Sequence, residues 1–498
     1  MTDVLLTHSY HLAYDRKQMR KMQPYPPLGT LYAASVLRAH GISVAVFDTM
    51  LRSPDEFLEA LHYHRPRCVA IYEDDFNFLS KMCLTRMREV AWQISHEARC
   101  FGSTVIAHGS DATDHPEEYL RHDAQFVLFG EAEIALRNLC AALLNNRETD
   151  HIPGLGTLEP GGRLRRQPGA PPSSTAWMSL PSPARDLIDF SPYRKAWVAS
   201  HGYFSLNMVA SRGCPYRCNW CAKPISGDRF HVRSAESVAN EMAELKLAYG
   251  AEHIWFGDDV FALNRHWAQE LAAIVQRRGD IVPFKVQSRA DLMSAETVDA
   301  LRRAGCTEVW MGVESGSQKV LDAMDKGLRI EQVVCAREHL RNAGIRACYF
   351  VQFGYPGETW PDIQKTVKLV RETRPDDIGV SVSYPLPNTV FYQRVQEQLG
   401  HKRNWTDSDD LCLMFRAPYT DGFYHALRNA LHAEVDSWSC TANDEATSTQ
   451  PSELWRQVVE LETTSRVPGA TPGWIAEANA ASNFFLPVDG LLPATTEP

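Results

Sequence analysis

The chain has 498 residues, and 44% of them are hydrophobic. A chain of this length can form two or three domains, each with its own core. The formal net charge of -10 at pH 7 disfavours binding to a nucleic-acid backbone. No stretch approaches the roughly 20 apolar residues of a membrane span, and residues 1–6 read as a strand instead of a signal peptide. The 12 cysteines stand mostly in apolar contexts, as expected for buried thiols of a cytoplasmic protein.

Residues 1–145 predict a doubly wound, Rossmann-like α/β domain. Apolar stretches of strand length alternate with segments that carry a helical apolar stripe. Strands are expected at 4–8, 44–47, 68–72, 104–107 and 124–129, and helices at 31–40, 56–64, 84–98 and 131–144. Strands separated by helices of this length form a parallel sheet. Such a sheet binds ligands at the carboxyl ends of its strands.

Three loops at those strand ends are rich in glycine and small polar residues. They are Pro26-Pro27-Leu28-Gly29, then Gly109–Thr113 followed by Pro116-Glu117-Glu118, and Phe129–Glu133. A lone glycine loop would be a weak signal, but three loops at one edge favour a ligand site there. The alternative is a flavodoxin-like domain that binds no cofactor.

Residues 146–200 are expected to form a linker. Proline, glycine and arginine dominate residues 161–172, and apolar residues are too sparse for a core. Residues 182–193 are expected to pack the join between two domains as a short helix or turn.

Three cysteines, Cys214, Cys218 and Cys221, stand in a C-x3-C-x2-C array directly after a short apolar strand. Thiolates are the usual ligands of iron–sulfur clusters. A 4Fe–4S cluster normally takes four thiolates, so an array of three leaves one iron open to another ligand. A zinc site is the alternative, and its fourth ligand would come from the nearest histidine, His231. The odd number of cysteines disfavours a disulfide.

Residues 201–395 predict a partial (β/α)6 barrel, because a strand followed by a helix recurs six times. In parallel barrels the chemistry lies at the carboxyl ends of the strands. Polar clusters follow the expected strands at Gly257-Asp258-Asp259, Ser288-Arg289, Gly312–Ser317, Gly354–Thr359 and Tyr384–Thr389.

The cysteine array resembles the signature of the radical S-adenosylmethionine (radical SAM) enzymes. The resemblance implies that Cys214, Cys218 and Cys221 hold a 4Fe–4S cluster and that SAM binds its open iron, with Trp220 against the adenine. The strand-end clusters then supply contacts to SAM. Acids beside a glycine suit its ammonium, Ser288 and Glu314 suit its ribose, and Arg289 suits its carboxylate. The SAM contacts implied in this way are Trp220, Gly257, Asp258, Asp259, Ser288, Arg289, Glu314, Ser315 and Gly354.

The three N-terminal loops resemble the cobalamin-binding domain that precedes the barrel in one large subfamily, the class B radical SAM methyltransferase type. Small residues and backbone N–H groups would approach the nucleotide tail of cobalamin. The contacts implied are Pro27, Leu28, Gly29, Gly109, Ser110, Asp111, Thr113, Gly130 and Glu131. Ser110 and Asp111 depart from the common pattern of this subfamily. No D-x-H-x-x-G motif is present, so no histidine is expected to bind cobalt from below, and residues 72–79 are expected to lie near that face.

The resemblance implies an enzyme that methylates an unactivated carbon, using a 5′-deoxyadenosyl radical and methylcobalamin. A cobalamin-dependent cyclisation, ring contraction or other rearrangement is the alternative, and a non-catalytic sensor of cobalamin or redox state is a more distant one. A small-molecule or peptide substrate and an external electron donor of the flavodoxin or ferredoxin type are expected, and no nucleic acid. Residues 396–498 are expected to form a mostly helical cap or substrate region, in which no catalytic residue can be chosen.

Overall fold

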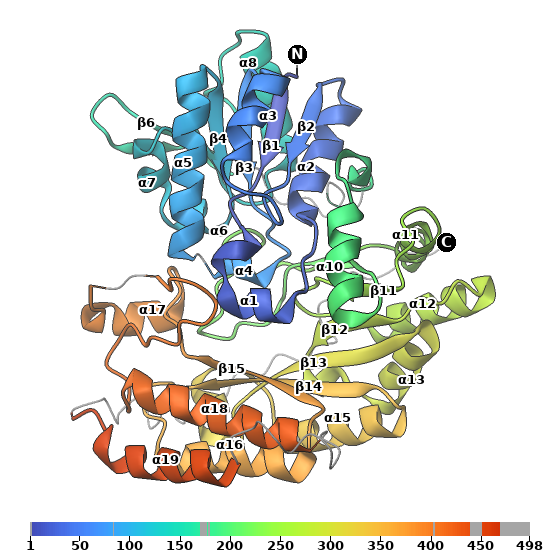
Figure 1. Cartoon of the computed structure of the whole chain (residues 1–498), viewed down its shortest axis with the longest axis vertical. Coiled ribbons are helices and arrows are strands. Elements are labelled where there is room, and N and C mark those ends of the chain that lie inside the picture. Colours follow the sequence, from blue (N-terminus) through green and yellow to red (C-terminus); the bar gives the residue numbers. More distant parts are fainter. Residues whose placement is uncertain are drawn as a thin grey trace, which may run out of the picture.

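The computed structural model describes residues 2–82, 84–169, 177, 180–401, 404–438 and 451–468. The chain forms two large sheets. In Figure 1 the first sheet lies above the second, and helix α1 (Arg16–Lys21) lies between them. The predicted fold class is confirmed: an N-terminal sheet rich in parallel strands precedes a six-stranded parallel sheet and a helical C-terminal region.

The first sheet has the strand order β2-β1-β3-β4-β5-β6-β7. Its five leading strands are parallel, as predicted, whereas β6 and β7 run antiparallel at one edge. The strands are β1 (Val4–Thr7), β2 (Val44–Phe47), β3 (Cys68–Tyr72), β4 (Thr104–His108), β5 (Phe126–Leu128), β6 (Leu155–Leu158) and β7 (Leu164–Arg166). This sheet places the predicted N-terminal loops along a single edge.

Helices cover both faces of the first sheet. Apolar side chains of α2 (Leu28–Ala39) and α8 (Glu133–Leu144) form one core with the sheet. Those of α3 (Glu56–His64), α5 (Thr85–Phe101) and α7 (Pro116–Arg121) form the other. The short helices α4 (Phe78–Lys81) and α6 (Ser110–Asp114) follow β3 and β4 at the carboxyl edge.

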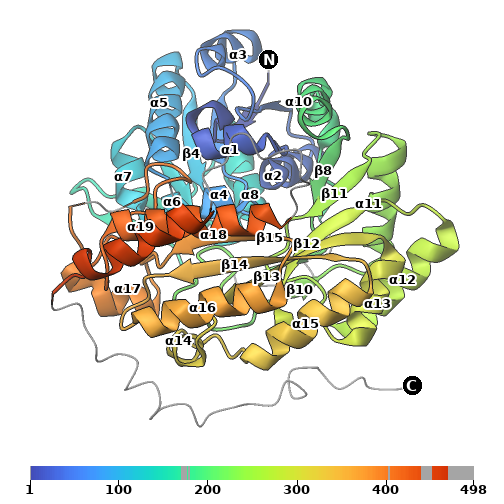
Figure 2. The ribbon, with the colours of Figure 1, turned by 60° about the horizontal axis from the view of Figure 1, so that its bottom comes forward.

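The second sheet has the order β15-β14-β13-β12-β11-β8. All its neighbouring strands are parallel, because each connection returns through a helix. The strands are β8 (Ser205–Met208), β11 (His253–Phe256), β12 (Phe284–Ser288), β13 (Cys306–Glu314), β14 (Arg346–Phe353) and β15 (Asp377–Val382). The connecting helices are α11 (Ala235–Leu247), α12 (Arg265–Arg278), α13 (Ala295–Ala304), α14 (Gln318–Ala323), α15 (Ile330–Asn342) and α16 (Trp360–Thr373), and they flank the sheet (Figure 2).

Alternate side chains of β13 point to opposite faces of the second sheet, one facing the hydrophobic core and the other facing a cavity. Val309, Met311 and Val313 are fully buried in the hydrophobic core. Gly312 and Glu314, on the opposite face, line a cavity. The polar side chains predicted at the strand ends therefore follow the period of a strand.

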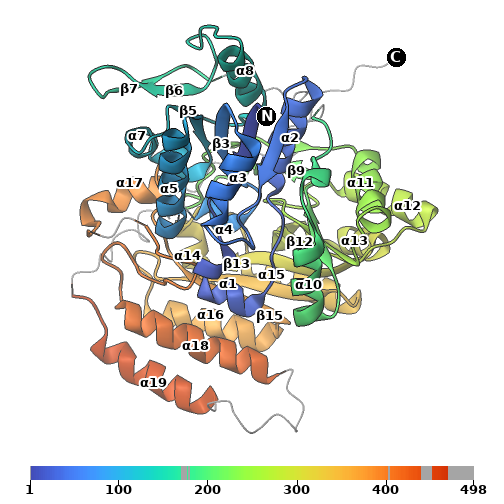
Figure 3. The ribbon, with the colours of Figure 1, turned by 45° about the horizontal axis from the view of Figure 1, so that its top comes forward.

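The C-terminal helices pack along the β15 edge. Helix α17 (Val390–Val395) follows β15, and α18 (Asp421–Ser437) lies against β15 and beside α19 (Pro451–Thr464) (Figure 3). The predicted C-terminal region also includes residues 402–403, 439–450 and 469–498, which lie outside the described residues.

Two parts of the expected linker are ordered elements. The hairpin of β6 and β7 extends the first sheet, and its two short strands carry three leucines, Leu155, Leu158 and Leu164, which give only a weak apolar signal in the sequence. Helix α10 (Ser191–His201) is longer than the predicted short helix or turn, and it buries Tyr193 and Trp197. Residues 170–176 and 178–179 of this stretch lie outside the described part.

The residues before α2 join the two sheets. Trp197 donates from Nε1 to the carbonyl oxygen of Pro24 at 2.7 Å, and Asn207 on β8 donates from Nδ2 to that of Pro26 at 2.9 Å. Helix α2 begins at Leu28, three residues earlier than predicted, since Asp74 accepts from the backbone N–H of Gly29 at 2.9 Å. The carboxyl edge of the first sheet is thereby held against the second sheet.

The loop after β14 contains a buried acid, Glu358. Its Oε2 accepts from the backbone N–H of Gly354 at 2.7 Å, and its Oε1 has no hydrogen-bond partner. Burial raises the pKa of Glu358 to about 8. The folded protein therefore keeps the proton on Glu358 at pH 7, whereas the unfolded chain releases it above roughly pH 4.3.

This difference predicts that Glu358 lowers stability as pH rises. Its contribution is fully present below roughly pH 4.3 and is lost by about pH 8, at up to about 1.4 kcal/mol per pH unit. Glu358→Gln keeps an acceptor for Gly354 but cannot ionise. Urea unfolding at several pH values between 5 and 8 should give a steeper loss of unfolding free energy for the wild type than for Glu358→Gln. Parallel pH profiles would contradict the assignment.

Candidate functional site

A two-strand ladder closes the loop that carries the three cysteines. β9 (Ser211–Arg212) pairs antiparallel with β10 (His231–Val232), so residues 213–230 form a closed loop. Gly213 opens this loop with φ +83°, and a side chain there would collide with the carbonyl oxygen of Arg229. The turn therefore requires glycine for its conformation and for its space.

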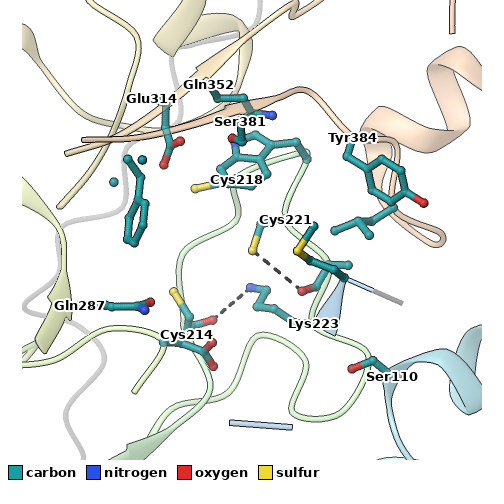
Figure 4. A pocket seen from close by; sticks show the side chains of 18 of the residues that line it. Ser110, Cys214, Cys218, Cys221, Lys223, Gln287, Glu314, Gln352, Ser381 and Tyr384 are labelled. Atoms are coloured by element: carbon teal, nitrogen blue, oxygen red, sulfur yellow. Dashed lines mark hydrogen bonds between the residues drawn. The ribbon is translucent and has the colours of Figure 1, made fainter. Parts of the chain in front are cut away.

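The side chain of Lys223 stabilises the cysteine loop through hydrogen bonds to its backbone. Its Nζ donates to the carbonyl oxygens of Cys214 at 3.0 Å and Tyr216 at 2.6 Å, and it pairs with Asp228 (Figure 4). One ammonium thus fixes both arms of the loop and places a positive charge beside the cysteines, where it offsets thiolate charge.

The three cysteines are half-buried and unpaired. Burial raises the pKa of the Cys214 thiol, and it raises that of Cys221 to about 12. The thiols of Cys214 and Cys221 are therefore protonated at neutral pH in the metal-free chain, and metal binding would release their protons.

The arrangement of the ligands bears on the zinc alternative. Among the described residues, no three histidine, cysteine, aspartate or glutamate side chains converge closely enough to hold a single metal ion. His231 lies on β10 in the ladder with Arg212. The corners of an iron–sulfur cube are separate metal atoms, so its thiolates need not converge on one point. The geometry favours a cluster over a mononuclear site.

A cavity of about 470 Å³ opens beside the cysteine loop. It lies within the size range of small-molecule sites. Its wall includes the three cysteines, the inner face of the second sheet, the edge of the first sheet and the segment after β15 (Figure 4). The residues from the first sheet's edge are Asp75, Phe76 and Ser110.

Five of the predicted SAM contacts line this cavity. They are Trp220, Asp259, Ser288, Arg289 and Glu314. Ser288 donates from Oγ to the carbonyl oxygen of Phe261 at 2.8 Å. The guanidinium of Arg289 lies 3.8 Å from the ring centroid of Tyr216 and pairs with Asp291 at 2.9 Å. These two contacts with Tyr216 and Asp291 fix the orientation of the Arg289 guanidinium on the cavity wall.

Glu314 forms a buried ion pair with Lys326. The distance from Glu314 Oε1 to Lys326 Nζ is 2.8 Å, and both side chains line the cavity. A Cβ at Gly312 would lie 2.7 Å from each of these two atoms, so the glycine gives the pair its space. Burial lowers the pKa of Lys326, but the nearby Glu314 carboxylate more than offsets this, and the pKa lies above the ordinary value of lysine.

The structure does not bring the other predicted SAM contacts to the cavity wall. Asp258 points away from it, where it accepts from the backbone N–H of Ala210 at 3.0 Å and from the Ser211 hydroxyl. Ser315 is fully buried beside Thr366, with their hydroxyl oxygens 3.2 Å apart. Gly257 and Gly354 are also absent from the wall, and a Cβ at Gly354 would lie 3.0 Å from Leu413. These positions shape the surroundings of the cavity.

The predicted cobalamin contacts cluster at the carboxyl edge of the first sheet. Gly109 has φ +138°, and a Cβ there would lie 2.7 Å from the Cβ of Glu73. Gly29 is similarly tight, since a Cβ at this position would lie 3.1 Å from the carbonyl oxygen of Glu73. The buried atoms Thr113 Oγ1 and Glu131 Oε1 have no hydrogen-bond partner in the part of the chain that the structure describes. The edge therefore combines close backbone packing with unsatisfied polar atoms.

Other predicted residues at this edge have partners within the protein. Asp111 accepts two bonds from the Arg88 guanidinium, at 2.6 and 2.7 Å. The carbonyl oxygen of Gly130 accepts from His108 Nε2 at 2.9 Å. Pro27 precedes helix α2, and Leu28 begins it and is fully buried. Among these residues, Ser110 is the one that lines the cavity.

Several cavity residues carry no motif in the sequence. Lys223 and Lys326 are isolated lysines whose partners lie across a loop or on another element. Lys17 comes from helix α1, which is short and polar and buries none of its residues. Lys223 stands two residues after Cys221, so its closeness to the array was the available signal. Lys326 and Lys17 could not be found without the fold.

Residues 208–370 match the sequence model of the radical SAM superfamily. This segment contains the cysteine loop and the second sheet through β14 and α16. The chain is a radical SAM protein. The matched segment includes Cys214, Cys218 and Cys221.

Curated relatives of this radical SAM protein share most of its length. An uncharacterised methyltransferase from Pyrococcus horikoshii is 27% identical over 389 residues, covering 76% of this chain and 81% of the relative. The hopanoid C-3 methylase of Methylococcus capsulatus is 24% identical over 407 residues, covering 80% of this chain and 73% of the relative.

A solved radical SAM structure shares the fold. The methyltransferase TsrM from Kitasatospora setae, determined with cobalamin and a [4Fe-4S] cluster, gives a TM-score of 0.67 at 21% identity. The match covers 80% of this chain and 78% of TsrM. Among the described residues, no helix is long and apolar enough to cross a membrane.

Two glycines of the cysteine loop give a matched test of its geometry. Gly213→Ala combines an unfavourable positive φ with a collision against Arg229, whereas Gly227→Ala has φ +62° and no atom within 4 Å of the added carbon. After anaerobic reconstitution, Gly213→Ala should lose most of its bound iron and visible absorbance, and Gly227→Ala should keep both. Equal iron contents would contradict the steric role of Gly213.

Proposed function

We propose that this protein is a cobalamin-dependent radical SAM enzyme that methylates an unactivated carbon atom of a biosynthetic intermediate. The observation that carries the proposal is a cavity lined by both cofactor regions. Cys214, Cys218 and Cys221 form one part of its wall, and Ser110 at the edge of the first sheet forms another. A substrate in this cavity would contact both regions.

The cysteine loop fits a 4Fe–4S cluster with one open iron. It offers three thiols on a cavity wall, a lysine that binds the loop's carbonyl oxygens, and a glycine turn that cannot accept a side chain. When bound, the cluster supplies the electron that cleaves SAM to the 5′-deoxyadenosyl radical.

The neighbouring residues orient SAM. Arg289 is held over Tyr216 by Asp291, and its guanidinium suits a carboxylate. Glu314 is fixed by Lys326 and suits the ribose hydroxyls. Asp259 lines the same wall and suits the ammonium. Groups that are already fixed by partners lose little freedom when the ligand binds.

The edge of the first sheet fits cobalamin. Gly29 and Gly109 let the loops at this edge pack tightly against Glu73, which fixes their backbone, and Thr113 and Glu131 offer polar atoms that have no partner among the described residues. Thr113, Ser110 and Glu131 would bind the corrin amides or nucleotide tail, and cobalamin supplies the methyl group. The two relatives described above, one named a methyltransferase and the other a methylase, support methyl transfer.

The segment after β15 contributes apolar side chains to the cavity wall. Tyr384, Leu386, Trp405 and Leu411 add apolar surface to the wall. Trp405 and Tyr384 pack with ring centroids 3.9 Å apart. Excluding water protects a reactive carbon radical from side reactions.

Cobalamin uptake has its own test. Gly109→Ala should lose cobalamin binding because the added carbon collides with Glu73, while the cysteine loop, which does not contact Gly109 through that carbon, still takes up iron. Gly41→Ala is the control, since Gly41 also has a positive φ, +75°, but no atom lies within 4 Å. Cobalt and iron are measured together after reconstitution. A Gly109→Ala protein that keeps its cobalt would contradict the assignment of this edge.

Methyl transfer is tested with SAM that carries a deuterated methyl group. The reconstituted protein, incubated with a reductant and small molecules from its own cells, should yield 5′-deoxyadenosine and a product that contains the labelled methyl group. Cys218→Ala should lose both, and Cys335→Ala should keep both because Cys335 is an exposed thiol on α15. An unlabelled product that has lost hydrogen would show ring formation instead.

A further inference from the structure

Six cations of the described chain line the cavity, and four of them have a carboxylate partner. The pairs are Arg212 with Glu133, Lys223 with Asp228, Arg289 with Asp291, and Lys326 with Glu314. The other two cations are Lys17 and Lys21 on α1. Among the residues that the structure describes, no carboxylate oxygen lies within 4.0 Å of either ammonium.

Lys17 is half-buried, and its hydrogen-bond acceptor within the described chain is a neutral atom. Its Nζ donates to the carbonyl oxygen of Ser408 at 3.2 Å. Burial and the positive charges of Lys21 and Arg428 lower its pKa to about 8, although Asp409 and Asp15 act in the opposite direction. A partly desolvated ammonium among other cations is stabilised by an added anion.

The two nearest acids are already engaged. Asp15 caps α1 and accepts from the Ser408 hydroxyl at 2.7 Å and from its backbone N–H at 3.3 Å. Asp409 pairs with Arg20 at 3.2 Å and with Arg428 at 2.8 Å. These bonds hold the segment around Ser408 against α1, so neither acid can turn to Lys17 without breaking them.

A second polar group on the wall lacks a partner. Gln352, on the inner face of β14, is 3% exposed, and its Oε1 accepts no hydrogen bond from the described residues. It lines the cavity opposite Ser381 of β15 in the strand register. A buried amide oxygen without a donor costs about 1–3 kcal/mol, and a ligand N–H or O–H group would remove that cost.

We propose that the substrate is an anion, with a carboxylate or phosphate group against Lys17 and Lys21 and a hydrogen-bond donor toward Gln352. Its apolar part lies along Trp405 and Tyr384. This inference rests on the proposed function, because it assigns the substrate class of the same cavity. SAM's own carboxylate has Arg289 on another part of the wall.

Three variants separate the charge of Lys17 from its contact with the segment at Ser408. Lys17→Gln removes the charge but keeps a donor for the Ser408 carbonyl oxygen, and Lys17→Arg keeps the charge. Gln18→Met is the matched control: it removes the 3.1 Å bond from Gln18 Nε2 to Ser408 Oγ and leaves the charge intact. A fourth variant, Gln352→Met, removes the amide at nearly constant volume.

The test compares the small molecules that each reconstituted protein retains from a cell extract, identified by mass spectrometry after equilibrium dialysis. The wild type, Lys17→Arg and Gln18→Met should retain one set of molecules that bear a carboxylate or phosphate group. Lys17→Gln and Gln352→Met should retain at least tenfold less of that set, with unchanged iron, cobalt and SAM affinity.

The proposal is overturned if the retained set is neutral or cationic, if Lys17→Gln retains as much as the wild type, or if Lys17→Gln loses cobalamin or SAM instead. Retention is measured without turnover. An anionic molecule that is retained but never methylated would therefore contradict the proposed function and still support the assignment of Lys17.

Discussion

The buried ion pair between Arg212 and Glu133 joins the two halves of the site. Arg212 ends β9, two residues before Cys214, and Glu133 begins α8 on the first sheet. Arg212 Nη2 lies 2.5 Å from Glu133 Oε1, and its guanidinium packs over Trp177 at 4.3 Å and Phe76 at 4.9 Å. Although burial opposes both charges, the partner keeps the pKa of Glu133 below and that of Arg212 above their ordinary values. Breaking such a pair costs about 3–5 kcal/mol, so the cysteine loop is firmly tied to the first sheet.

Because of this ion pair, the cysteine loop and both sheets contribute to the wall of one cavity. A cluster on the cysteine loop and a ligand on the edge of the first sheet would face a common space, with the inner face of the second sheet as its floor. Helix α1 and the segment around Ser408 close another side, and five hydrogen bonds or ion pairs join them although the two segments are about 390 residues apart in the chain. The architecture therefore brings together chemistry from the first, middle and last parts of the sequence.

Much of the fold was readable from the sequence because it repeats. Strand and helix alternate with strong apolar periodicity in both sheets, and the confirmed fold class follows from that pattern. The hairpin β6–β7 falls within the predicted linker because its strands are only four and three residues long and carry little apolar signal. Helix α1 was not predicted, since it is polar, short and stabilised by a cap at Asp15 and by contacts with residues near 408.

Less of the site could be predicted from the sequence, because only part of it is formed by residues that are close together in the chain. The cysteine array is local in sequence, and the structure places Trp220, Asp259, Ser288, Arg289 and Glu314 together beside it. Asp258 and Ser315 stand next to these residues in the chain, but they follow the strand ends and are held by contacts away from the cavity, with Ala210 and Ser211 and with Thr366. The ion pair of Arg212 with Glu133 joins distant elements, and the lack of a carboxylate partner for Lys17 and Lys21 among the described residues also follows from the fold. Such contacts cannot be predicted from the spacing of residues in the sequence.

The electron paramagnetic resonance spectrum of the reduced, reconstituted protein, recorded with and without SAM, tests the central claim most directly. A cluster held by three cysteines keeps one iron open, so the signal of a reduced 4Fe–4S cluster should appear and should shift when SAM is added. A protein that binds zinc in place of iron, or a cluster signal that SAM leaves unchanged, would contradict the account.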